Sequence, residues 1–455
     1  MIMTEINEDN GWIFGWILLL LIAFFILYTV SKKYSSRTYK RDFINMSDRH
    51  SRGKKLTRAL AYICLQVLRP QDEISQKYKR EFQKFFDKLI QLMKDEDELF
   101  EAIYNGPSYQ GSTFENTKII VPNEYDVNLE LVLTDCFYIE IEEQDTYPGF
   151  ARVRLNRKRK VKDRYMMRKI MEEWLDDEDY ICQNEVLNWL KSVVDRALNK
   201  MDNDNVVRRE SGPAITVYVT TNEGDEFSVD LVPALYLGTE YLPRRQYNIL
   251  MRMCRDIDIS DLGWHLVPKR ARDEWGRQSD DVTQWRMSFY LYERRFMQDL
   301  YGYKPTFRLL KWFRDRQKWT RISSYYLKTL FLWELKRKGS DFWKKTAPGE
   351  LFLHMLDCLR QHLDNKRIAF FWDKKCNLIG HLPDDYLERT YDDLDGFISD
   401  LEDALDNQDE NASAETLGEM FNITLDKRRI RNSFVAKKVN YLYHDLINNS
   451  KRLVL

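Results

Sequence analysis

The chain has 455 residues, and its 71 basic and 72 acidic side chains leave a formal net charge of −1. A sum so close to zero neither favours nor excludes a polyanionic partner, so the positions of the charges must decide. The six cysteines include no C-x-x-C pair, which excludes a zinc knuckle and is typical of reduced core thiols.

The first segment with a clear character is the uncharged apolar stretch 11–30. A helix needs about 20 apolar residues to cross a bilayer, so the stretch predicts a transmembrane helix. Basic residues follow it, which predicts a body facing the cytosol. A cleaved signal peptide would need a basic start and a small-residue cleavage site, and neither is present. We therefore expect a single-pass membrane protein with a short extracytosolic N-terminus at 1–10 and a basic tether at 31–55.

A helix is predicted over residues 73–104, where aromatic and aliphatic side chains recur along one stripe. A different face of this helix carries a cationic ridge, which consists of Lys77, Arg80, Lys84 and Lys88. The ridge suits a phosphate backbone, but solvated charges on a helix exterior give the same pattern. Both interpretations stay open.

The most informative motif comes next, in a loop and the strand predicted at 121–131. The loop contains Gly111 and Ser112, which offer backbone N–H groups and a hydroxyl to a phosphate. Along the strand, apolar residues alternate with polar ones, so Glu124 and Asp126 share one face. Hard carboxylate oxygens are the ligands of divalent cations that bind nucleotides, and the pair therefore predicts a magnesium site and nucleotidyl transfer.

Further along, a basic run includes Arg157, Lys158, Arg159 and Lys160, and forms either a polyanion contact or a solvated loop. Strands at 214–219 and 227–232 form a predicted hairpin, with Asp230 on its polar face as the natural third carboxylate. After residue 242 the pattern becomes helical, at 246–254, 285–300, 307–319 and 325–335. We expect an α/β (α+β) chain with a sheet lobe at 56–245, a helical lobe at 246–406 and a polar tail at 407–455.

Several of these segments resemble the cyclic GMP-AMP synthase-like receptors. The resemblance begins with residues 111–119, residues 122–127 and Asp230. It continues in the same order as in that family through 266–269, 285–289, 309–312, 323–329 and 358–360. The resemblance implies a bilobed nucleotidyltransferase fold, with a twisted mixed β-sheet and a long helix in the first lobe and helices in the second.

The same resemblance implies roles for individual residues. Gly111 and Ser112 would hold the donor triphosphate, and Glu124, Asp126 and Asp230 would bind two magnesium ions, or manganese in their place. The donor phosphates would contact Lys311, Ser324 and Lys328. Tyr325 would stack on a base, and Arg286 with Lys269 would line the nucleobase pocket.

The chain departs from the vertebrate DNA sensor of this family, because residues 296–306 contain no His or Cys for a zinc thumb. We therefore expect no zinc. The chain is in this respect more similar to the invertebrate receptors that sense double-stranded RNA, which implies double-stranded RNA, read by shape at a basic groove, as the activating ligand, with DNA as the alternative. ATP and GTP would be the substrates, and a STING-type receptor would respond to the product.

Three hypotheses follow. The chain is a nucleic-acid-activated cyclic dinucleotide synthase of innate immunity, a membrane-tethered interaction protein of this fold without catalysis, or a linear oligoadenylate-type synthase. The presence of Gly111, Ser112 and all three acids favours catalysis. The linkage of the product and its two bases stay open.

Overall fold

The chain divides into two compact units, Met1–Arg52 and Gly53–Leu455, and the fold is that of the second unit. The computed structural model describes residues 51–57, 60, 72–115, 117–118, 123–158, 164–201, 206–211, 214–254, 257–273, 276–298, 300, 302–406, 416 and 418–420. Most of the predicted tether and tail lie outside these residues.

The predicted membrane localisation is contradicted. No helix within the described residues is long and apolar enough to cross a bilayer. The predicted span 11–30 itself lies outside the described part of the chain.

In the described residues, nine strands form one mixed sheet, whose main path runs β1-β2-β7-β8-β9-β4-β3, with β6 beside β7 and β5 beside β6. The strands are β1 (Tyr104–Gln110), β2 (Glu124–Leu131), β3 (Phe137–Glu143), β4 (Phe150–Arg157), β5 (Val206–Ser211), β6 (Ala214–Thr220), β7 (Glu226–Leu237), β8 (Trp264–Pro268) and β9 (Gln284–Ser288). Strands β2 and β7 are parallel, whereas the other named pairs are antiparallel. The predicted mixed sheet is confirmed.

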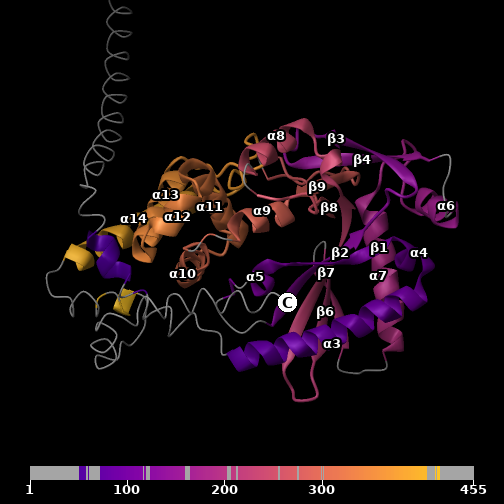
Figure 1. Cartoon of the computed structure of the whole chain (residues 1–455), viewed down its shortest axis with the longest axis horizontal. Helices are drawn as coiled ribbons and strands as arrows, with labels where there is room; N and C mark the ends of the chain where they lie inside the picture. The colour runs from indigo at the N-terminus through magenta and orange to yellow at the C-terminus, as the bar shows by residue number, and fades with distance from the viewer. Residues whose placement is uncertain are drawn as a thin grey trace, which may run out of the picture. The chain divides into compact units, whose positions relative to one another are not determined.

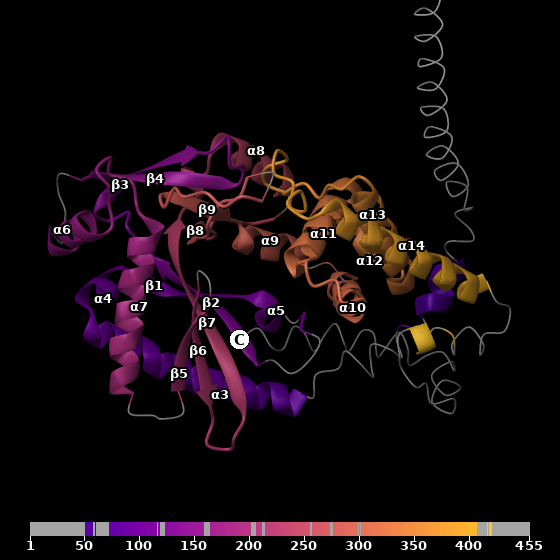
Figure 2. The same cartoon turned by 180° about the vertical axis from the view of Figure 1, so that it is seen from behind.

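The helices fall into two groups (Figures 1 and 2). Those that accompany the sheet are α3 (Asp72–Glu96), α4 (Glu98–Ile103), α5 (Gly111–Phe114), α6 (Arg164–Glu173), α7 (Gln183–Lys200) and α8 (Arg244–Met253). A helical C-terminal part follows, as predicted, with α9 (Tyr290–Met297), α10 (Tyr303–Arg316), α11 (Ser324–Lys338), α12 (Ser340–Lys345), α13 (Pro348–Asp364) and α14 (Asp384–Asp406).

Helix α3 packs its aromatic stripe on one face of the sheet. Phe82 stacks on Tyr125 of β2 with 4.0 Å between ring centroids, and Phe85 meets Phe227 of β7 edge to face at 6.1 Å. Side chains alternate between the two faces of a strand, so burying Tyr125 and Val127 under α3 leaves Glu124 and Asp126 on the other face.

The predicted helix 73–104 is in fact two helices and the start of a strand. Asp97 separates them, because its carboxylate accepts the Phe100 N–H at 2.9 Å and so caps α4. Tyr104 then begins β1, which lies at an edge of the sheet, where a strand tolerates Pro107.

The predicted boundary between lobes at residue 245 precedes two strands of the sheet. Strands β8 and β9 follow it and join the central sheet, and β9 with α9 replaces the helix predicted at 285–300. Both strands have five residues and are largely buried on both faces. Strands buried on both faces show no alternation of apolar and polar residues, so the sequence pattern does not predict them.

Candidate active site

A row of polar side chains crosses four neighbouring strands. Asp126 of β2 and Asp230 of β7 are direct register partners, with Gln110 of β1 opposite Asp126 and Thr216 of β6 opposite Asp230. Partners on neighbouring strands place their side chains on the same face, so the two carboxylates adjoin. The Thr216 hydroxyl donates a hydrogen bond of 2.6 Å to Asp230 Oδ1. The structure thus brings together two of the three predicted acids.

The pKa of Asp126 is raised above its ordinary value. Loss of hydration is the main cause, and repulsion from the carboxylates of Asp230 and Glu124 adds to it. A divalent cation among these oxygens would remove that repulsion. The chemistry of the donor set therefore fits such an ion.

The third acid, Glu124, makes a different contact. Its Oε2 pairs with Lys118 Nζ at 2.7 Å, and the Thr113 hydroxyl donates to its backbone carbonyl at 2.8 Å. Across the described ranges, no group of three His, Cys, Asp or Glu side chains lies close enough to hold a metal ion. Asp126 and Asp230 would hold a cation, and Glu124 would join them only by leaving Lys118.

Gly111 brings the backbone against the acidic row. Its φ is +75°, a conformation that L side chains rarely adopt, and an added Cβ would lie 1.8 Å from Asp126 Oδ2. No other residue type fits without displacing the carboxylate. The Gly111-Ser112 loop is therefore built against Asp126.

A cavity of about 1340 Å³ opens beside this loop, between the sheet and the helical part. All eight residues predicted to bind nucleotides line it: Gly111, Ser112, Lys269, Arg286, Lys311, Ser324, Tyr325 and Lys328. The three acids are not among its lining residues, although Gly111 connects the cavity to Asp126. The cavity volume suffices for more than one nucleotide-sized ligand.

Two lysines come from the helical side of the cavity. Lys311 on α10 is only 6% exposed and donates to the Thr117 carbonyl at 3.1 Å. Burial, and then the charge of Arg314, lowers the pKa of Lys311 to about 8. Lys328 on α11 pairs with Glu115 at 2.8 Å and with Glu293 at 3.4 Å. Burial opposes its charge, but the two carboxylates outweigh burial and hold the pKa of Lys328 well above its usual value.

Glu293 is not among the residues expected from the sequence, although it organises this side of the cavity. It is 1% exposed, and its Oε1 accepts from the Tyr325 hydroxyl at 2.8 Å and from Trp372 Nε1 at 3.0 Å. Tyr325 is thereby held by its hydroxyl at the cavity wall. Glu293 is the one acid of α9 and is followed directly by Arg294 and Arg295, so its sequence context is that of an ordinary solvent-exposed charge and gives no signal of its burial.

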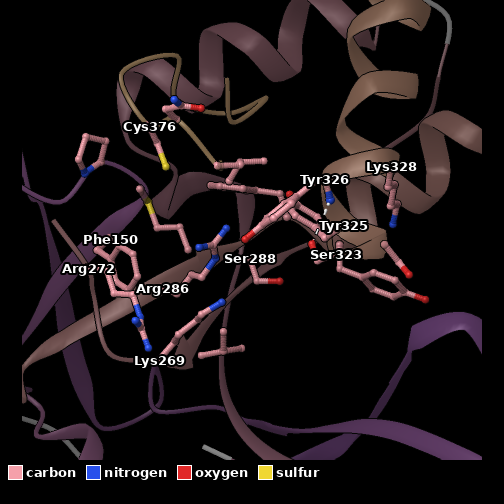
Figure 3. A pocket seen from close by; sticks show the side chains of 18 of the residues that line it. Phe150, Lys269, Arg272, Arg286, Ser288, Ser323, Tyr325, Tyr326, Lys328 and Cys376 are labelled. Atoms are coloured by element: carbon pink, nitrogen blue, oxygen red, sulfur yellow. Dashed lines mark hydrogen bonds between the residues drawn. The ribbon is translucent and has the colours of Figure 1, made fainter. Parts of the chain in front are cut away.

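Figure 3 shows the residues at the other end of the cavity, where Lys269, Arg272 and Arg286 gather. The Arg286 guanidinium lies near the Phe150 and Phe370 rings, 5.8 and 5.3 Å from their centroids. The charge of Arg286, followed by burial and the charge of Arg272, lowers the pKa of Lys269 to about 8. No feature of the sequence distinguished Arg272 from its basic neighbours.

The predicted nucleic-acid-binding residues lie elsewhere. Arg80, Lys84 and Lys88 are exposed on α3, but Lys77 pairs with Glu223 and Asp225 of the β6–β7 turn, so its charge is balanced. Arg157 is exposed at the end of β4, and Lys158 donates to the Thr134 carbonyl at 2.6 Å. Arg159 and Lys160 lie outside the described residues.

Two family models match the chain. Residues 113–299 match the Mab-21 protein nucleotidyltransferase domain, and residues 302–396 match the Mab-21 protein HhH/H2TH-like domain. The matched regions nearly adjoin and together make up more than half of the chain. The first contains Asp126 and Asp230, and the second contains Lys311 and Lys328.

The chain is also similar to several known insect proteins. A cyclic GMP-AMP synthase-like receptor of Microplitis demolitor is 31% identical over 350 residues, which is 73% of this chain and 63% of that protein. The chain thus spans less than two thirds of that relative's length. Proteins of the same description from Trichogramma pretiosum and Ctenocephalides felis are 26% and 27% identical; each alignment covers 78% of this chain, and 77% and 86% of the respective relative. These names mention no membrane and no downstream receptor.

Proposed function

Because the chain belongs to the Mab-21 nucleotidyltransferase family, we propose that it joins ATP and GTP into a cyclic dinucleotide of the cGAMP type. One observation carries this proposal: Asp126 and Asp230 are register partners, and Gly111 links them to a cavity lined by cationic side chains. The names of the insect relatives support the cyclic product.

The donor nucleotide would place its triphosphate beside Gly111 and Ser112, where Lys311 and Lys328 offer positive charge. Tyr325, fixed through Glu293, would present its ring to a base. Asp126, Asp230 and Glu124 would hold a magnesium pair, which would supply charge neutralisation for the phosphoryl transfer. Asp230 would accept the proton of the attacking hydroxyl, since Thr216 occupies only its Oδ1.

The activating ligand in this proposal is double-stranded RNA, and the setting is innate immune signalling. The relatives are named receptors, which supports a ligand-controlled activity. Exposed Arg80, Lys84 and Lys88 on α3, with Arg157 at the end of β4, provide positive charge for a phosphate backbone. Binding there would favour the competent arrangement of the Gly111-Ser112 loop.

One observation favours a second candidate, an interaction protein of this fold without catalysis. Glu124 is engaged by Lys118 rather than by its fellow acids. If the Glu124–Lys118 ion pair persists when nucleotide and cation are supplied, Glu124 cannot join Asp126 and Asp230 in binding the cation. A linear oligoadenylate-type product is the remaining alternative, because the same acids serve both linkages.

One experiment separates these functions. The full chain is incubated with ATP, GTP and magnesium, with double-stranded RNA, double-stranded DNA or neither, and products are identified by mass and by linkage-specific phosphodiesterase digestion. We expect a cyclic dinucleotide that forms with RNA and is absent from the Asp126→Asn variant. A linear product would support the oligoadenylate-type alternative. No product with any ligand would overturn the enzyme assignment.

A further inference from the structure

The nucleotide cavity holds a second cationic cluster, distinct from Lys311 and Lys328. Lys269 directly follows β8, Arg286 lies in the neighbouring strand β9, and Arg272 lies in the loop between them. Figure 3 shows these three side chains together at one end of the cavity, whereas Lys328 lies at the other, beyond Ser288 and Tyr325. The cavity therefore has two separate positive ends.

Among the residues that the structure describes, none of the carboxylates pairs with a cation of this cluster. Within the described residues, no ion pair involves Lys269, Arg272 or Arg286, and Arg272 donates only to the Gly276 carbonyl, at 3.4 Å. Two other basic residues that line the cavity are neutralised, since Arg277 pairs with Asp273 at 2.7 Å and Lys375 with Asp145 at 2.7 Å. Arg270 and Arg367 also line it, and both donate to backbone carbonyls.

Three like charges held together at a cavity wall repel one another. The lowered pKa of Lys269, for which Arg286 is the main cause, expresses that repulsion. Such a cluster is stabilised by an anion, and guanidinium groups match phosphate oxygens with paired N–H donors. A nucleobase is neutral and would leave the three charges uncompensated.

We propose that Lys269, Arg272 and Arg286 bind the 5′-phosphates of the acceptor nucleotide. The proposal rests on the proposed nucleotidyl transfer and changes the role expected of Lys269 and Arg286, from contacting a base to contacting phosphate. The two ends of the cavity then hold two sets of phosphates, with Tyr325 and Tyr326 between them for the bases. The acceptor class is a nucleoside 5′-phosphate, and a bare nucleoside is a poor acceptor.

The first test measures the KM of two acceptors, GTP and unphosphorylated guanosine. The donor, ATP, is kept at a saturating concentration. Arg272→Gln should raise the KM for GTP about tenfold, the usual value of a charged hydrogen bond, and leave the KM for guanosine unchanged. The control is Arg277→Gln, which removes the same charge from the same loop but from a residue already paired with Asp273. It should change neither KM more than about twofold.

If Arg272→Gln raises both KM values by the same factor, the cluster reads the base or the ribose, and the proposal is overturned. Equal effects of Arg272→Gln and Arg277→Gln on the KM for GTP would also overturn the proposal, because the net positive charge of the cavity, and no specific contact of Arg272, would then determine that KM.

A second test needs no catalysis and so remains informative if the proposed enzyme activity is absent. Inorganic tripolyphosphate is titrated into the full chain by calorimetry. In Arg272→Gln, tripolyphosphate should bind about tenfold more weakly at one site. In Arg277→Gln, binding should be unchanged. In Lys311→Gln, binding should be lost at a different site. Unaltered binding in Arg272→Gln would refute the phosphate site independently of any product measurement.

Discussion

Lys328 Nζ on α11 lies 2.8 Å from Glu115 Oε1, which joins the helical part of the protein to the segment that follows Gly111 and Ser112. Both side chains are nearly buried, and Glu293 lies 3.4 Å from the same ammonium group. Lys328, which is expected to bind donor phosphates, therefore also connects the two halves of the site. Its replacement will affect folding as well as binding.

Replacing Lys328 by Met should destabilise the protein strongly, because the buried charges of Glu115 and Glu293 would lose the ammonium group that compensates them. Breaking a buried pair from one side costs about 3 to 5 kcal/mol. Urea unfolding measures the loss, and adding Glu115→Gln should restore part of it. Lys345→Met, which breaks the exposed pair with Asp341, is the control and should have no measurable effect. Additive effects of Lys328→Met and Glu115→Gln would mean that the two residues are not coupled.

Replacing Asp126 by Asn should abolish product formation without loosening the fold. The amide keeps the shape of the side chain but lacks the anionic oxygen that a cation needs. It also removes repulsion from Asp230, so thermal unfolding at neutral pH, without metal, should occur at the same or a higher temperature.

The pH dependence of this effect has a definite sign. The folded-state pKa of Asp126 is raised, so its stability cost is present above that pKa and is relieved as pH falls through it towards the unfolded value of about 3.9. The stability advantage of Asp126→Asn should therefore shrink as the pH is lowered from neutral towards about 4. An advantage that grows on acidification would contradict the assigned repulsion.

Nucleotide binding should weaken as the pH rises through about 8, where Lys311 loses its proton. The ammonium attracts phosphate only below that pH, and losing a charged hydrogen bond costs about tenfold in affinity. Titrating ATP from pH 6.5 to 9.5 checks this. Lys311→Arg, which stays charged, should flatten the profile, and Lys269→Arg should flatten what remains, because the pKa of Lys269 is also about 8. If both variants kept the pH profile of the unsubstituted protein, the two lysines would be excluded as the cause of that profile.

Reversing Arg80 and Lys84 to Glu should weaken nucleic-acid binding for all sequences alike and lower its salt dependence by about one unit of slope per lost contact. Fluorescence anisotropy at several salt concentrations measures both. Lys77→Gln is the control and should have little effect, since Glu223 and Asp225 already balance that charge. Unchanged affinity in the double variant would make α3 a solvated face and direct attention to the Arg157–Lys160 run.

The sequence could predict the parts of the site that depend on the pattern of neighbouring residues along one strand. Alternation along β2 placed Glu124 and Asp126 on one face, and the same rule on β7 selected Asp230. The register of β2 against β7 could not be predicted, because parallel strands distant in the chain carry no local signal of their alignment. Only the register makes Asp126 and Asp230 partners.

Side-chain pairing was equally beyond the sequence. Glu115 and Lys328 are separated by 213 positions, and nothing local indicates that one neutralises the other. The ridge on α3 shows the converse case. Four cations at helical spacing looked equivalent, but the β6–β7 turn happens to place two acids beside Lys77 alone.

The parallel pairing of β2 with β7 also bears on how the protein is made. Asp126 leaves the ribosome long before Asp230, and the two meet only after all the intervening strands and helices have been synthesised. Closing so long a loop is slow and cooperative with the rest of the sheet. A nascent or prematurely terminated chain that ends before β7 thus carries Gly111, Ser112 and Asp126 but no acidic pair. An incomplete chain of this kind lacks the arrangement of carboxylates on which the proposed nucleotidyl transfer depends.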